Sequence, residues 1–357
     1  MQIVPHSFIY IIIPSYEPDE KLLKLLKNLT NQNIKRIILV NDGSSPKYDS
    51  FFNIARDRYN CIVLTHPENK GKGRALKTAF KYILQNENNI IGCITADSDG
   101  QHTVSDIMQI MQALIENPNK LILGCRNFNS DNVPIKSKFG NNCTRKVMHF
   151  LYGMNISDTQ TGLRGIPYAF IQKLLNVGGE RFEFETNMLV ESKNSFSIME
   201  VPIETVYDSK EEHKTHFNPV KDSLKIYSIF IKRIFGFLLS SLSSSILDLT
   251  LFTSFVHLLR ESFAAYIIIA TLIARVISAI YNYTINHYFI FKSKEQYIYS
   301  LPKYAFLAVC IMVSSGLLVT VGTRIFPLVP EVFIKLPVDI GLFIVSYSVQ
   351  RSCVFKQ

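Results

Sequence analysis

The most informative stretch of the chain reads Ile90-Ile91-Gly92-Cys93-Ile94-Thr95-Ala96-Asp97-Ser98-Asp99-Gly100-Gln101-His102. An apolar run of strand length is followed at once by two carboxylates, which predicts Asp97 and Asp99 at the C-terminal tip of a buried strand. Two acids so close together must repel each other or share a cation. Hard oxygen ligands suit Mg²⁺ or Mn²⁺, and substrate phosphates often complete the shell of such an ion. An acidic turn is the alternative for an Asp-x-Asp pattern taken alone.

The composition indicates two different parts. The chain has 357 residues, is 47% hydrophobic and carries a formal net charge of +9. Polar and apolar segments alternate up to about Phe217, whereas long apolar runs dominate from Ile229 onward. We therefore expect a soluble α/β domain followed by a membrane domain. No cleavable signal peptide is expected, because residues 8–13 form too short an apolar run and lack a basic front.

Cysteines and basic residues indicate the surroundings of the protein. The six cysteines are scattered without a Cys-x-x-Cys pair, which favours reduced thiols facing the cytosol over zinc sites or disulfides. Lysines and arginines cluster beside apolar segments, so an anionic membrane surface is a better partner than nucleic acid.

Predicted strands alternate with predicted helices along the soluble half. We expect strands at 8–13, 37–40, 61–64, 90–95 and 121–124, and helices at 19–29, 48–58, 71–84 and 104–116. This alternation predicts a mostly parallel sheet covered on both faces. Ligands of such sheets bind beyond the carboxyl ends of the strands. One edge should therefore carry residues 14–17, Asp42, Asp97, Asp99 and Arg126.

Asp42 and two lysines are candidates for nucleotide binding at this edge. Asp42 would accept hydrogen bonds from a base or ribose, and Lys70 and Lys72 near a helix N-terminus would face phosphate oxygens. A simple turn and a flexible helix entry are the structural alternatives. The glycines match neither a Walker loop nor a dinucleotide fingerprint, so ATP hydrolysis and NAD binding are disfavoured.

Four motifs follow one another in a recognisable order. They are Ile12-Ile13-Pro14-Ser15-Tyr16-Glu17, Val40-Asn41-Asp42-Gly43-Ser44-Ser45, Asn69-Lys70-Gly71-Lys72-Gly73 and Ala96-Asp97-Ser98-Asp99-Gly100-Gln101-His102. They resemble the motifs of family 2 inverting glycosyltransferases, above all dolichyl-phosphate mannose synthases and bacterial undecaprenyl-phosphate sugar transferases. The resemblance continues through residues 121–126, 157–164 and 181–188. It implies a GT-A nucleotide-sugar-binding domain, which we place at residues 1–217.

Roles for individual residues follow from this resemblance together with the lysine loop. The expected nucleotide-sugar ligands are Pro14, Tyr16, Glu17, Asp42, Lys72 and Asp97. The expected metal ligands, for Mg²⁺ or Mn²⁺, are Asp97, Asp99 and Gln101. The expected catalytic residues are Asp99, Arg126 and Asp158, with Asp158 orienting the sugar. The expected contacts to an acceptor phosphate are Arg126, Lys138 and Arg164.

Two departures from the mannose synthase pattern leave alternatives open. The acceptor helix has Lys136, Ser137, Lys138 and Asn142 in place of the arginine and serine of the synthases. After Val201-Pro202-Ile203 the chain leads to Asp208 rather than to a basic residue, and the candidates for that role are His213, Lys214 and His216.

The predicted helix 136–152 has its own pattern. Phe139, Cys143, Val147 and Leu151 recur every four residues among basic side chains. This pattern suits a helix at a membrane interface, and a helix packed on its own domain is the alternative.

Four apolar segments predict the membrane domain, at about 234–259, 263–289, 304–321 and 332–354. A basic linker helix at 218–233 would precede the domain, which covers 234–357. Basic flanking residues predict that the soluble domain and both termini are cytoplasmic in a multi-pass cell-membrane protein.

An internal repeat and two charges distinguish these segments. Residues 286–292 match residues 350–356, which predicts two duplicated hairpins. The pattern resembles the GtrA family of four-helix proteins, which implies anchoring or flipping of lipid-linked sugars. Asp248 and Arg275 are costly in a bilayer, so we expect them to pair inside the bundle, either fixing helix register or lining a headgroup path.

The functional hypothesis is an inverting, metal-dependent hexosyltransferase at the cytoplasmic membrane face that serves cell-envelope glycan modification. A nucleotide sugar (UDP-glucose, UDP-N-acetylglucosamine or GDP-mannose) would donate one hexosyl unit to undecaprenyl or dolichyl phosphate. The acceptor is largely a dianion at neutral pH, so no strong general base is needed. A lipid-linked sugar transporter and a processive polysaccharide synthase are the alternatives, although the chain has no tryptophan for the synthase's acceptor channel. A homo-oligomer is compatible with the sequence.

Overall fold

The computed structural model describes residues 8–128, 135–193, 195–204, 221–261 and 266–355. The chain divides into two compact units, one formed by Met1–His149 with Met154–Ser228 and one formed by Phe150–Gly153 with Ile229–Gln357. The predicted donor-closing region at 208–216 lies outside the described residues, as do the side chains of Lys136 and Ser137.

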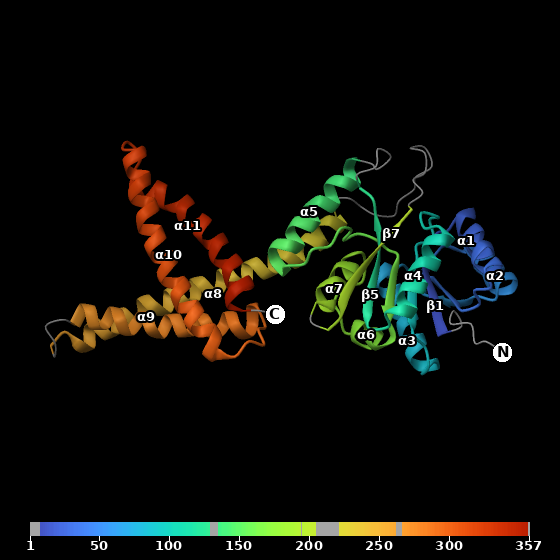
Figure 1. The fold of residues 1–357 in the computed structure, drawn as a ribbon, viewed down its shortest axis with the longest axis horizontal. Helices are drawn as coiled ribbons and strands as arrows, with labels where there is room; N and C mark the ends of the chain where they lie inside the picture. The colour runs from blue at the N-terminus through green and yellow to red at the C-terminus, as the bar shows by residue number, and fades with distance from the viewer. Residues whose placement is uncertain (1–7, 129–134, 194, 205–220, 262–265, 356–357) are drawn as a thin grey trace. The chain divides into compact units, whose positions relative to one another are not determined.

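One sheet of seven strands organises the N-terminal unit (Figure 1). The strands are β1 (Ile9–Ser15), β2 (Ile37–Asn41), β3 (Ile62–Thr65), β4 (Gly92–Thr95), β5 (Lys120–Arg126), β6 (Arg164–Pro167) and β7 (Ser197–Ile203). Their order is β3-β2-β1-β4-β6-β5-β7, and only β6 runs antiparallel to its neighbours among these strands. The predicted mostly parallel α/β sheet is confirmed, with β4 starting at Gly92 rather than Ile90.

Helices cover this sheet because their apolar residues recur on one face. They are α1 (Glu20–Asn31), α2 (Asp49–Tyr59), α3 (Lys72–Asn86), α4 (Val104–Glu116), α5 (Ile135–Tyr152), α6 (Tyr168–Leu174) and α7 (Glu183–Ser192), with a 3₁₀ turn at Pro46–Tyr48. In α1, Leu22, Leu25, Leu26 and Leu29 are buried, which is the spacing of a single helical stripe.

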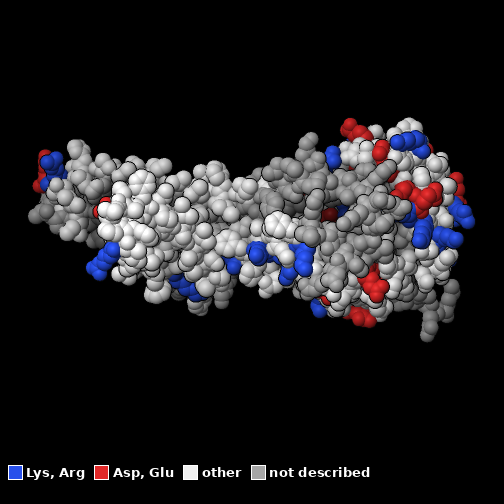
Figure 2. All heavy atoms as spheres, turned by 90° about the horizontal axis from the view of Figure 1, so that it is seen from above, with Lys and Arg blue, Asp and Glu red and all other residues white. Residues whose placement is uncertain are grey.

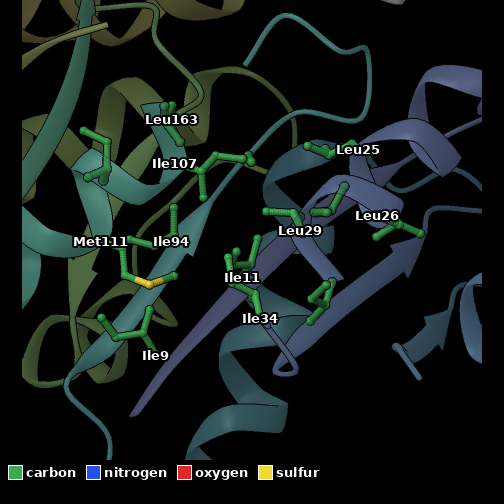
Figure 3. Close-up of a cluster of buried hydrophobic side chains, with 14 of the residues drawn as sticks. Ile9, Ile11, Leu25, Leu26, Leu29, Ile34, Ile94, Ile107, Met111 and Leu163 are labelled. Carbon is green, nitrogen blue, oxygen red and sulfur yellow. The ribbon is translucent and has the colours of Figure 1, made fainter. Parts of the chain in front are cut away.

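The core lies between β1, β4 and the helices α1 and α4 (Figure 3). Ile9 and Ile11 of β1 and Ile94 of β4 pack with leucines of α1, and Ile107 and Met111 of α4 complete the cluster. Every residue of β1 is buried, as expected for a strand covered on both faces. This packing fixes the strand ends from which the site is built.

Helix α5 packs on its own domain along a stripe next to the predicted one. Up to His149, the buried residues are Asn141, Thr144 and Met148, whereas Phe139 is 69% exposed; the last turn, from Phe150, belongs to the other unit. Lys138, Arg145 and Lys146 are exposed as well. The buried positions therefore differ from the predicted ones, which recur every four residues. They follow the 3.6-residue helical repeat instead, and two of them, Asn141 and Thr144, are polar and hydrogen-bonded.

The C-terminal unit consists of long apolar helices. They are α8 (Lys221–Leu259), α9 (Tyr266–Ile285), α10 (Tyr297–Ile325) and α11 (Glu331–Val349), and π-helical turns extend α9 (η3, Asn286–Ile290) and α11 (η4, Gln350–Val354). Among the described residues four segments are long and apolar enough to cross a membrane: Ile234–Leu259, Tyr266–Ile290, Tyr297–Ile325 and Phe333–Val354. Few charged side chains lie on the face of these helices seen in Figure 2.

Two helix boundaries differ from prediction. Helix α10 begins at Tyr297 rather than about Tyr304, because Pro302 lies within the helix and does not end it. Helix α8 is continuous from Lys221, so the described part of the predicted linker helix and the first membrane segment form one helix.

The two repeated segments adopt the same conformation. Each forms a π-helical turn followed by a phenylalanine, Phe291 or Phe355. The two rings stack with centroids 5.2 Å apart, and Asn286 Nδ2 donates to Gln350 Oε1 at 3.1 Å. The duplicated signatures therefore meet each other inside this unit.

The two predicted intramembrane charges are paired, but only one of them is shielded. Arg275 NH1 lies 3.6 Å from Asp248 Oδ2. The Asp248 side chain is 22% exposed, whereas the Arg275 side chain is 73% exposed. The expectation that both face the bundle interior therefore does not hold for Arg275, most of whose side chain is exposed although it lies beside Asp248.

Candidate active site

The ends of β1 and β2 are tied together by short loops. The Asp42 amide donates to Ser15 O at 2.9 Å, and the Glu17 amide donates to Ser44 Oγ at 2.8 Å. Glu17 has a φ of 49°, so the chain turns sharply after β1. Pro14 lies within β1, and Tyr16 and Glu17 follow its last residue. The predicted nucleotide-binding residues of these two loops are thus held in one rigid corner.

The Asp42 carboxylate is occupied by protein donors. Its Oδ1 lies 2.7 Å from His66 Nδ1 and accepts from the Lys70 amide at 3.0 Å, while Oδ2 accepts from the Gly71 amide at 2.8 Å. His66 Nε2 lies 2.8 Å from Thr78 Oγ1 of α3. Asp42 and His66 therefore fix the loop that leads into α3, an arrangement that sequence reasoning missed for His66.

Lys72, the first residue of α3, connects two acidic motifs. Its Nζ lies 2.6 Å from Asp97 Oδ1 and 3.0 Å from Glu185 Oε1 of α7. Burial acts to lower the pKa of Lys72, but the two carboxylates outweigh it and raise that pKa above its ordinary value. Glu185 lies in a motif that the sequence singled out without giving this residue a role.

The surroundings of Asp97 and Asp99 shift the pKa values of the two carboxyl groups in opposite directions. Burial acts to raise the pKa of Asp97, but Lys72 and then His102 Nε2, 3.3 Å from Asp97 Oδ2, hold it well below its usual range. The pKa of Asp99 is raised, first by burial and then by the negative charge of Asp97. Asp99 Oδ1 accepts from the Gln101 amide at 3.1 Å. An added cation would relieve the repulsion that Asp99 experiences.

The donor set suits a hard divalent ion. The described residues contain no cluster of three or more His, Cys, Asp and Glu side chains placed to hold a metal. The carboxylates of Asp97 and Asp99 and the side-chain amide oxygen of Gln101 nevertheless supply the oxygen ligands that Mg²⁺ and Mn²⁺ prefer. Such ions take further oxygens from substrate phosphates. The residues present therefore fit the predicted metal.

Gly162 allows a close approach to Asp97. A Cβ atom at this position would lie less than 3.0 Å from the Asp97 carboxylate. The carbonyl of Gly162 also accepts from Thr95 Oγ1 at 2.7 Å. The segment 157–164 therefore needs glycine here because its backbone packs directly against the site.

Arg126 and Asp158 form a forked ion pair beside β5. Arg126 Nε donates to Asp158 Oδ2 at 2.6 Å and its NH2 donates to Oδ1 at 3.0 Å. Asp158 is fully buried and also accepts from the Gln160 amide at 3.0 Å. Its carboxylate thus orients Arg126.

The other two expected acceptor contacts lie in contrasting surroundings. Arg164 is fully buried: its Nε donates to Thr161 O at 2.9 Å and its NH1 donates to Glu185 O at 2.7 Å. Burial lowers the pKa of Arg164. Lys138 is exposed on α5. Arg164 therefore holds backbone carbonyls of two segments together, whereas Lys138 is accessible.

Comparisons with known proteins agree with this architecture. The glycosyl transferase family 2 model matches residues 10–175, and the GtrA/DPMS transmembrane domain model matches residues 235–355. UDP-N-acetylglucosamine–dolichyl-phosphate N-acetylglucosaminyltransferase from Methanococcus voltae is 31% identical over 226 residues, covering 56% of this chain and 86% of that protein. The chain belongs to glycosyl transferase family 2.

This glycosyltransferase is similar to other proteins as well. A dolichyl-phosphate β-glucosyltransferase from Trichomonas vaginalis is 23% identical over 217 residues, covering 55% of this chain and 65% of that protein. Among solved structures, glucosyl-3-phosphoglycerate synthase from Mycobacterium tuberculosis in complex with Mn²⁺, UDP and phosphoglyceric acid aligns with a TM-score of 0.45 and 11% identity, covering 62% and 75% of the two chains. The glycosyltransferase is a multi-pass membrane protein with a GtrA-type C-terminal domain.

Proposed function

We propose that this glycosyltransferase moves one hexosyl unit from a nucleotide sugar to a polyprenyl phosphate, with inversion. The observation that carries the proposal is the joining, in one chain, of a family 2 domain with a GtrA/DPMS transmembrane domain. A lipid phosphate acceptor accounts for a membrane domain attached to a nucleotide-sugar site. The names of the two relatives make UDP-N-acetylglucosamine and a nucleotide-activated glucose the first donors to test.

A divalent metal forms the second part of the proposal. Asp97, Asp99 and Gln101 would hold Mg²⁺ or Mn²⁺, which when bound offsets the charge of the leaving nucleoside diphosphate. The ionised Asp97 and the raised pKa of Asp99 support this assignment, because two neighbouring carboxylates require positive charge. Lys72 supplies part of that charge through its contact with Asp97.

The chain's own residues account for donor binding and alignment. Lys72 begins α3, where the helix N-terminus and the ammonium group both favour phosphate oxygens. Asp42 holds the backbone of the preceding loop, so the position of Lys72 is fixed before the donor binds. Pro14, Tyr16 and Glu17 lie on the adjacent loop, where we place the nucleotide.

Arg126 is the proposed contact to the acceptor phosphate. The Asp158 carboxylate holds the guanidinium in one orientation, and 14% of the Arg126 side chain is exposed. A fixed guanidinium suits a phosphate dianion, which already carries the nucleophilic oxygen without a strong base. Lys138 on α5 would add accessible positive charge. We leave Arg164 out of this contact because it is buried.

We place the catalytic domain and both termini in the cytoplasm, with transfer at the inner membrane face. Basic residues near this junction support the orientation: Lys292 and Lys294 lie between α9 and α10, and Lys303 lies near the start of α10. Nucleotide sugars and cell-envelope intermediates would then meet on one side of the membrane.

The test is transfer of labelled sugar into the organic phase. Purified full-length protein in detergent is incubated with Mn²⁺, with undecaprenyl or dolichyl phosphate, and with one labelled nucleotide sugar at a time. We expect transfer from one donor, loss of transfer with a chelator, and recovery on adding Mn²⁺. Asp99→Ala should abolish transfer. Retained nucleotide binding without transfer from any donor would instead support a transporter of lipid-linked sugars.

A further inference from the structure

A charge pair lies near the middle of two membrane-spanning segments. Asp248 of α8 lies 248 − 234 = 14 residues after the start of its span, and Arg275 of α9 lies 275 − 266 = 9 residues after the start of its own. At 1.5 Å per residue these positions are roughly 21 Å and 14 Å from those ends. Both groups are thus well inside the apolar region and need partners there.

The two members of the pair are not equally satisfied. Asp248 Oδ1 accepts from Ser278 Oγ at 2.9 Å, and its Oδ2 lies 3.6 Å from Arg275 NH1. Its side chain is 22% exposed, against 73% for Arg275. The carboxylate is therefore held by the bundle, whereas the guanidinium, a group with five donors, extends from it.

Protein carboxylates of a second copy offer a poor partner for Arg275. In the four described spans the acidic residues are Asp248 and Asp339. Asp339 accepts from Ser315 Oγ at 3.0 Å and its Oδ2 lies 3.0 Å from Lys335 Nζ. A copy would have to break that pair in order to offer Asp339. A lipid phosphate would not require that ion pair to break.

We propose that Arg275 binds the phosphate group of a membrane lipid, with Asp248 as the counter-ion that the phosphate displaces. Guanidinium and phosphate match in geometry and charge. When Arg275 turns outward, Asp248 keeps the hydrogen bond from Ser278 Oγ at 2.9 Å, and that hydroxyl has Arg275 O at 3.2 Å as its second acceptor. The site is independent of the transfer reaction and lies apart in sequence from Arg126.

The test measures lipid retention by purified full-length protein using native mass spectrometry, without nucleotide sugar. An Arg126→Gln background removes the proposed acceptor contact of the active site. The probes are undecaprenyl phosphate, phosphatidylglycerol and uncharged undecaprenol. We expect retention of a phosphate-bearing lipid and loss of undecaprenol. A preference for undecaprenyl phosphate would identify the polyprenyl lipid as the source, and equal retention of phosphatidylglycerol would identify phospholipid.

Two variants should act in opposite directions. Arg275→Gln should weaken retention of the phosphate lipid about tenfold or more, as expected for losing a charged hydrogen bond. Asp248→Asn should strengthen retention, because it removes the competing carboxylate while keeping the shape. The double variant Asp248→Asn with Arg275→Gln carries neither charge of the pair, so it remains testable where a single variant fails to fold. It should retain the phosphate lipid as poorly as Arg275→Gln.

Other results would overturn the proposal. Weaker retention in both single variants, or unchanged retention in both, would show a structural ion pair. Because no sugar transfer is measured, an inactive enzyme would leave this readout intact, and failure of the proposed function is distinguishable from failure of the lipid site.

Discussion

Asp97 is enclosed on several sides, by Lys72, His102 and the backbone of Gly162. The sequence predicted Asp97 from its position after an apolar run, and the repeated acidic strand ends placed Asp42 near it. The contacts of His66 and Glu185 could not be predicted, because each depends on side chains from distant parts of the chain meeting at hydrogen-bond distance.

Gly162→Ala should lower kcat/KM at least about tenfold, because the added methyl group must displace the Asp97 carboxylate. The measurement is sugar transfer under saturating lipid acceptor. Gly178→Ala is the matched control, since its Cβ would meet no atom closer than 3.9 Å. Equal activity of the two variants would contradict the close approach.

His66→Leu should raise the KM for the nucleotide sugar about tenfold, with a smaller change in kcat. The reason is that Asp42 loses one donor and holds the Lys70 and Gly71 amides less rigidly. His66→Asn keeps a donor near the position of Nδ1 and should recover most of the affinity. A fall in kcat at unchanged KM would argue against a positioning role.

Cys61 should resist alkylation in the folded protein. Burial raises its pKa to about 12, so at pH 8.5 only a very small fraction of the thiol is ionised. Cys143 is partly exposed, lies outside the membrane-spanning segments and should react first. Mass spectrometry after iodoacetamide treatment checks this, with the unfolded protein as the control in which both cysteines react. Modification of native Cys61 would contradict its burial.

At the scale of secondary structure, hydrophobic periodicity predicted the order and the type of the expected helices and strands. The apolar stripe of α1 and the fully buried β1 follow from local sequence alone. The start of α10 did not, because the helix begins at Tyr297, before the apolar segment, and runs through Pro302. The exposure of Arg275 likewise depends on how α8 and α9 pack.

The π-helical turns give a prediction for the membrane domain. Asn286 is fully buried and hydrogen-bonds with Ser240, Asn282 and Gln350. Asn286→Leu should lower the free energy of unfolding by about 1 to 2 kcal/mol, since buried polar partners lose their bonds. Thermal unfolding in detergent measures the effect.

The control for this experiment is Thr284→Val. Thr284 lies two residues away, and its hydroxyl donates to Ile280 O of its own helix at 2.7 Å. Its stability should match the wild type. A stable Asn286→Leu variant would show that the polar contact between the repeats is dispensable.

At the scale of the whole molecule, composition alone separated a soluble domain from a membrane domain. Membrane orientation can be tested on intact cells or spheroplasts with a maleimide that does not cross membranes. In a Cys353→Ser background, Leu328→Cys between α10 and α11 should be labelled from outside, because Leu328 is 96% exposed. Lys294→Cys should be labelled only after permeabilisation. The reverse pattern would place the catalytic domain outside.

The meeting of Asn286 with Gln350, and of Phe291 with Phe355, also bears on the origin of the membrane domain. An ancestor with a single hairpin would have made this contact between two separate molecules, at a strength set by their concentration. Fusion of two gene copies turns the contact into one within a chain, with a high effective concentration. The two halves then no longer need identical contact surfaces. This accounts for the opposite charges of Arg275 and Asp339, which occupy the same position in the two repeats.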